Sequence, residues 1–96
     1  VHKTNLLRMG QLVMNSENMT VQYRGKELDL SNKEYQLLKY FMLNEGKVLP
    51  RETILTDVWG YDGGETRTLD NHIARLRKLG LNFETVFGVG YKFIAD

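Results

Sequence analysis

The chain has 96 residues, 42% of them hydrophobic, and a formal net charge of +1. This length suits one domain with a modest core, and the hydrophobic content argues against disorder. No apolar run approaches the ~20 residues of a membrane span, and no signal-peptide pattern opens the chain. The absence of cysteine excludes disulfides, thiolate metal sites and thiol nucleophiles, and it favours a reducing compartment, for which we expect the cytoplasm.

The first third of the chain predicts a small antiparallel sheet. Residues 1–5 carry no pattern, and we interpret them as the end of a linker. Short runs with alternating apolar residues then predict about four strands, at 6–9, 11–15, 20–24 and 26–30. Arg24 and Gly25 are a plausible two-residue hairpin turn between the last two of these. A sheet with one apolar face requires helices to cover it.

Two helices are predicted next. Ser31 and Glu34 have the spacing of a capping box at the start of the first helix, and Gly46 is the expected C′ residue at its end. Pro50 suits the first position of a second helix, because the N–H that proline lacks is not needed there. Gly60 is expected to end that helix.

The segment 65–78, ETRTLDNHIARLRK, organises the remaining sequence. At helical spacing its apolar residues share one stripe, formed by Leu69, Ile73 and Leu76. The opposite stripe contains no acid and no large apolar residue, and consists of Arg67, Asn71, Ala74, Arg75 and Lys78. Arginine and asparagine pair bidentately with guanine and adenine in the major groove, so this stripe is a candidate DNA-reading face. The alternative is an ordinary solvated basic face.

Two β-rich runs, 83–87 and 91–94, surround Gly88-Val89-Gly90 and predict a terminal hairpin. A helix pair followed by a hairpin is the outline of a winged helix, in which the last helix enters a major groove and the hairpin lies along adjacent backbone. The predicted fold class is therefore α+β, a winged helix-turn-helix. The glycine-rich loop 60–64 is either a partner contact or a flexible connector, and the sequence alone favours a connector.

Catalytic motifs are not evident. Gly88 and Gly90 begin a GxGxxG pattern, but Phe93 occupies its last position and no helix follows. Asp62 and Glu65 lack the ligand spacing of a calcium loop. No nucleophile accompanies a histidine in any motif. We expect no enzyme activity, no metal and no cofactor.

Taken together, the chain closely resembles the OmpR/PhoB-type winged-helix effector domain of bacterial two-component response regulators. The matching segments are ELDLSNKEYQLLKYF, GKVLPRETILTDVWG, ETRTLDNHIARLRK and TVFGVGYKF, and order and spacing match over about residues 7–94. The resemblance implies sequence-specific binding of double-stranded DNA and regulation of transcription at the end of a phosphorelay. The domain would then span residues 6–96, and the receiver domain that carries the phosphorylated aspartate is absent from this chain.

The resemblance also implies partners. Family members bind direct-repeat half-sites as head-to-tail dimers. In some members the loop between the second and third helices touches RNA polymerase, and here that loop consists of Gly60, Tyr61, Asp62, Gly63 and Gly64.

Site residues follow by position. Arg75 and Asp70 match positions that face bases. Asn71 stands where a valine is common, and its amide either reaches adenine or is simply solvated. Backbone contacts are expected from Arg67, Thr68, His72, Arg77, Lys78, Trp59, Thr85, Tyr91 and Lys92. Alternatives remain for four of these: Arg77 as an intrahelical partner for acids, His72 as a structural residue, Trp59 as mostly core, and Lys92 as a solvated side chain.

The wing departs from the family pattern. Phe87, beside Gly88 at the wing tip, replaces an arginine that can enter a narrow minor groove. The connection 79–82 is shorter than in many members, so we expect a wing held tightly against the helix. Phe87 and the small net charge favour a competing hypothesis, a winged helix used only for protein binding. The basic stripe without acids favours DNA.

Overall fold

The computed structural model describes residues 6–60 and 66–95, so the predicted linker 1–5 and most of the loop 60–64 lie outside the described residues. The N-terminal sheet is antiparallel, with four strands in the order β1-β2-β3-β4. Their bounds are Leu6–Met9, Leu12–Asn15, Thr20–Tyr23 and Lys26–Leu28. Arg24 and Gly25 both have positive φ angles, 54° and 79°, as a two-residue hairpin turn requires. The predicted sheet is confirmed.

Helix α1 (Asn32–Leu43) begins with the predicted capping box. The Ser31 N–H donates to Glu34 Oε1 at 2.9 Å, and the Glu34 N–H donates to Ser31 Oγ at 3.2 Å. The prediction of Gly46 as the C′ residue is wrong, because α1 is capped earlier by Asn44, whose side-chain amide donates to the Tyr40 carbonyl at 2.8 Å. Gly46 instead donates its N–H to the Phe93 carbonyl at 2.9 Å.

The second helix starts one residue later than predicted. Pro50 is the residue before α2 (Arg51–Ile54), which widens into a π-helical turn, η1 (Leu55–Trp59), and ends at Gly60 as expected. Pro50 is displaced because it closes a strand, β5 (Val48–Pro50), that the sequence analysis missed. A strand of this length offers too few residues for an alternation pattern, and proline fits it only because β5 lies at a sheet edge.

The predicted hairpin is confirmed as β6 (Phe83–Val86) and β7 (Gly90–Phe93). With β5 it forms a second antiparallel sheet of three strands in the order β5-β7-β6. The wing is therefore anchored to the chain segment that leads into α2, and the Arg51 N–H donates to the Val89 carbonyl at 3.1 Å.

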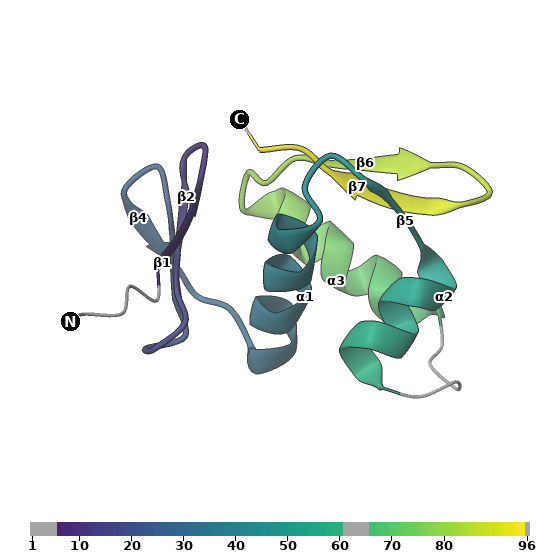
Figure 1. Ribbon diagram of the computed structural model, residues 1–96, viewed down its shortest axis with the longest axis horizontal. Coiled ribbons are helices and arrows are strands. Elements are labelled where there is room, and N and C mark those ends of the chain that lie inside the picture. Colours follow the sequence, from purple (N-terminus) through teal and green to yellow (C-terminus); the bar gives the residue numbers. More distant parts are fainter. Residues whose placement is uncertain (1–5, 61–65, 96) are drawn as a thin grey trace.

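Helix α3 (Thr66–Lys78) supplies the predicted apolar stripe. Leu69, Ile73 and Leu76 are fully buried in one core with residues of α1 and the hairpin. Within that core the Phe41 and Phe83 rings pack edge to face, with centroids 5.0 Å apart. Figure 1 shows α1 between the N-terminal sheet and α2, with the hairpin running over α3. No described helix is long and apolar enough to cross a membrane.

The close approach of β5 and β7 yields a stability prediction. A Cβ on Gly90 would lie 2.0 Å from the Leu49 carbonyl oxygen, so Gly90→Ala must push the two strands apart. We expect it to lower the free energy of unfolding by about 3 kcal/mol or more, measured by urea denaturation.

Gly88→Ala is the matched control in the same turn. A Cβ there meets open space, and only the φ of +79° opposes it. The expected loss is about 1–2 kcal/mol. Equal losses for the two variants would contradict the packing explanation.

Candidate nucleic-acid interface

The outer face of α3 is exposed along the whole described helix. Every residue of the predicted basic stripe is exposed: Arg67, Asn71, Ala74, Arg75 and Lys78. The helix thus presents cations and one amide outward while its other side is fixed in the core. At a rise of about 1.5 Å per residue, such a helix is roughly 20 Å long, enough to lie in a major groove.

Arg75 has a partner that the sequence analysis missed. Its Nε forms an ion pair with Oε2 of Glu34, and the side chains are 67% and 4% exposed, respectively. The stripe on α3 itself contains no acid, as predicted, but Glu34 of the neighbouring helix α1 pairs with it. The available signal was the capping box, which places a glutamate in the first turn of a helix that packs against α3.

Arg77 holds the wing. Its Nε and one terminal nitrogen donate to the Phe83 carbonyl at 3.1 and 2.8 Å, and that nitrogen also donates to Thr85 Oγ1 at 2.7 Å. These partners belong to β6 and not to acids of α3. The helix and the first wing strand are therefore joined directly across the short connection 79–82.

Asp70 and Tyr91 join a second set of contacts between α3, β7 and the start of α2. The Tyr91 hydroxyl donates to Asp70 Oδ1 at 2.5 Å, and the same oxygen lies 3.0 Å from a terminal nitrogen of Arg51. Burial of Tyr91 and its bond to Asp70 raise the pKa of the phenol, so it remains a donor at neutral pH. Both side chains, predicted as DNA contacts, already have intramolecular partners, although Asp70 is 39% exposed.

Trp59 and His72 pack against each other where η1 meets α3. Their rings meet edge to face with centroids 5.3 Å apart, and both residues are half-buried. His72 Nδ1 lies 2.8 Å from the Thr68 carbonyl oxygen. The Lys33 ammonium lies 5.5 Å from the centre of the indole and donates to the Val58 carbonyl. These contacts place a cation and two aromatic rings beside the N-terminal half of α3.

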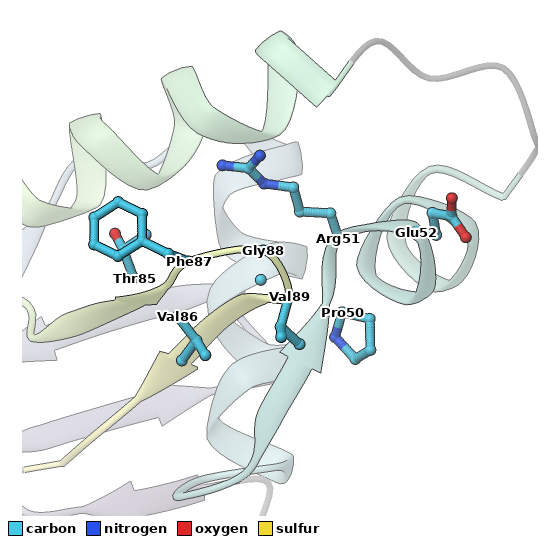
Figure 2. A pocket seen from close by; sticks show the side chains of 9 residues that line it. Pro50, Arg51, Glu52, Thr85, Val86, Phe87, Gly88 and Val89 are labelled. Carbon is cyan, nitrogen blue, oxygen red and sulfur yellow. The ribbon is translucent and has the colours of Figure 1, made fainter.

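The wing tip carries an unusual side chain. Phe87 is 91% exposed, and it projects from the wing in a different direction from Val86 and Val89 (Figure 2). An open groove of about 570 Å³ lies against the wing and the start of α2, and its lining includes Pro50, Arg51 and residues 85–90. Lys92 is half-buried, with its ammonium 3.6 Å from Glu84.

Two features complete the site. Gly60 ends η1, whereas Tyr61, Asp62, Gly63 and Gly64 of the candidate polymerase loop lie outside the described residues. Among residues 6–60 and 66–95 there is no cluster of three or more histidine, cysteine or acidic side chains that could hold a metal ion.

Comparison with known proteins places the chain among regulators. Residues 25–93 match the family model described as "Transcriptional regulatory protein, C terminal". The heme response regulator HssR of Staphylococcus saprophyticus is 36% identical over 96% of this chain and 44% of its own length. HssR of Staphylococcus aureus strain JH9 is 38% identical with the same coverage. The chain thus spans less than half the length of these curated relatives.

Solved structures agree with the sequence relatives. The DNA-binding domain of Klebsiella pneumoniae RstA, solved in complex with the RstA box, superposes with a TM-score of 0.82 at 30% identity, covering 97% of this chain and 98% of that one. The Thermotoga maritima response regulator DrrB, an OmpR/PhoB homologue, superposes with a TM-score of 0.81 at 33% identity, covering 97% and 46%. The chain belongs to the transcriptional regulatory protein C-terminal family, the OmpR/PhoB-type DNA-binding domains of response regulators.

Proposed function

We propose that this domain reads a specific sequence of duplex DNA by laying α3 in the major groove, with the β6–β7 wing on adjacent backbone or in the minor groove. DNA binding and transcription regulation by a response regulator are the activity of the family. The observation that carries the proposal is the exposed stripe of α3, which is basic along its length while the opposite stripe is buried. A helix fixed on one side and cationic on the other matches the shape and charge of a major groove.

We propose that residues in the middle of the basic stripe of α3 read the bases. Arg75 and Asn71 are exposed and carry the groups that recognise guanine and adenine edges. Ala74 lies between them and adds no bulk, which lets the helix approach the groove floor. Asp70 is a weaker candidate than its position implies, because Arg51 and Tyr91 already pair with one of its carboxylate oxygens, Oδ1.

Backbone contacts surround these readers. Arg67 and Lys78 are exposed at the two ends of the stripe, and Thr68 is half-buried beside it. Trp59 and His72 lie half-buried at one edge, while Arg77, Thr85, Lys92 and the buried Tyr91 lie on the wing side. We propose that this second group acts mainly through register, since phosphate contacts position a protein without reading sequence.

A protein-binding winged helix is the second candidate, and Phe87 is the observation that favours it. A phenylalanine that is 91% exposed at a hairpin tip suits an apolar partner surface as well as a deoxyribose edge. The charge of α3 argues for DNA, because a helix that binds protein has no reason to exclude acids from the stripe formed by Arg67, Asn71, Ala74, Arg75 and Lys78.

Three further proposals concern the location, the assembly and the protein partners of the domain. We propose that the domain works in the cytoplasm as the output of a receiver-containing response regulator, binding direct-repeat half-sites as a head-to-tail dimer. The coverage of less than half of HssR is consistent with a further domain in such a protein. Contact of the 60–64 loop with RNA polymerase remains a proposal from family resemblance.

Sequence-specific binding is tested by selecting bound duplexes from a random-sequence pool at two salt concentrations. We expect a repeated motif and an affinity that falls steeply with salt, because each neutralised phosphate contributes about 0.9 to the slope of log K against log salt. A featureless pool with little salt dependence would reject DNA reading by the isolated domain.

Arg75→Ala and Arg77→Ala should separate base reading from wing positioning. On the selected site, Arg75→Ala should remove roughly 1–3 kcal/mol of discrimination between the preferred base and its replacements. Arg77→Ala should lower the affinity for all duplexes similarly, by about tenfold. It removes the hydrogen bonds that hold the wing and a contact with the DNA backbone. Fluorescence anisotropy with single-base variants of the site measures both effects.

Arg8→Ala is the matched control for these two variants. It removes the same charge from an exposed position on β1, remote from α3, and should change affinity little. Uniform loss on every duplex for both α3 variants would contradict the division of roles.

Phe87→Arg tests where the wing lies. An arginine at the tip should strengthen binding to sites that carry an A-tract beside the motif, because narrow minor grooves concentrate negative potential. Val89→Arg adds the same charge in a different direction and controls for general attraction. If Phe87→Arg gives no gain specific to A-tract sites, the wing does not enter a minor groove.

A further inference from the structure

The carboxylate of Glu34 is buried, and its two oxygens have different partners. Oε1 accepts the Ser31 N–H at 2.9 Å, closing the capping box of α1. Oε2 pairs with Nε of Arg75 on α3. The Glu34 side chain is only 4% exposed, whereas that of Arg75 is 67% exposed. The buried carboxylate of Glu34 therefore pairs with Nε of Arg75, while most of the Arg75 side chain faces solvent.

This contact selects which edge of the guanidinium is presented outward. With Nε turned toward Glu34, the two terminal nitrogens form the far end of the side chain. Two N–H groups of one arginine satisfy O6 and N7 of guanine together. A free arginine would have to be ordered on binding, which weakens association by about tenfold, whereas a tethered one is ordered when the domain folds.

The same ion pair restrains the charge of Arg75. Without the ion pair, an arginine at this position would adopt several side-chain conformations over the outer face of α3. Some of them would reach phosphates on either side of a groove. Such contacts raise affinity for every sequence and carry no information. The ion pair with Glu34 therefore opposes non-specific DNA binding and favours one base-reading conformation of Arg75.

We propose that Glu34 is a positioning residue for Arg75, one that increases sequence discrimination at the expense of non-specific affinity. The inference rests on the proposed function, because it requires Arg75 to read a base. It assigns a recognition role to a buried residue of α1 that touches no DNA. The capping box thereby links the start of α1 to the reading face of α3.

Glu34→Gln tests the inference on the duplex recovered from the random pool, with single-base variants and a shuffled duplex alongside. We expect discrimination at the base read by Arg75 to fall about five- to tenfold. Affinity for the shuffled duplex should rise, and its salt slope should steepen by about 0.9, as one more phosphate contact forms. In an Arg75→Ala background, Glu34→Gln should leave discrimination unchanged.

Ser31→Ala is the matched structural control. It removes the hydroxyl of the capping box but keeps both Glu34 and Arg75, so it should lower thermal stability without changing discrimination. Glu34→Asp keeps the charge but shortens the side chain; it should also lose discrimination, and it provides a second test if Glu34→Gln folds poorly. Circular dichroism establishes that each variant is folded.

The remaining outcomes overturn the inference in distinguishable ways. If Glu34→Gln and Glu34→Asp leave discrimination intact, Arg75 reads its base without the tether. If specific and shuffled duplexes weaken equally, Glu34 supports only the fold. If the wild-type chain shows no sequence preference, or Arg75→Ala does not change it, the proposed function itself fails and the inference fails with it.

Discussion

Burial of the apolar stripe of α3 is the constraint on which the rest of the structure depends. Leu69, Ile73 and Leu76 are completely buried, and burying each such side chain contributes about 1.5–3 kcal/mol. A helix anchored by three residues on one side has only one rotation about its axis that satisfies them. That rotation turns the basic stripe outward, so the packing of the core also orients the candidate reading face.

Polar contacts then fix the wing relative to that helix. Arg77 donates to the backbone and side chain of β6, and Tyr91 of β7 donates to Asp70, which also pairs with Arg51. Several of these groups are among the residues predicted to touch DNA. Their intramolecular bonds give them a second role, which is to hold α2, α3 and the wing in one arrangement. Substitutions here are expected to act on geometry as well as on direct contact.

Two of the cations on α3 and the wing have acidic partners. Glu34 pairs with Arg75, and Glu84 lies beside Lys92. Non-specific attraction to phosphates grows with unpaired cations, so this pairing moderates it. Specific recognition depends more on where the exposed donors point, and that is set by the fold.

Most elements and their faces can be predicted from local patterns of period and turn chemistry. These patterns are the alternating strands, the capping box at Ser31, the α3 stripe and the hairpin around Gly88. The sequence analysis missed β5, because three residues ending in proline carry no readable period. It also predicted Gly46 as the C′ residue of α1, whereas the helix is capped earlier, by Asn44. The partners of Arg75, Arg77 and Asp70 could not be predicted in this way, because they come from elements far away in the chain or across a turn: Glu34, β6, Arg51 and Tyr91. Local patterns record which face a residue occupies, whereas pairing across elements depends on how the core packs them together.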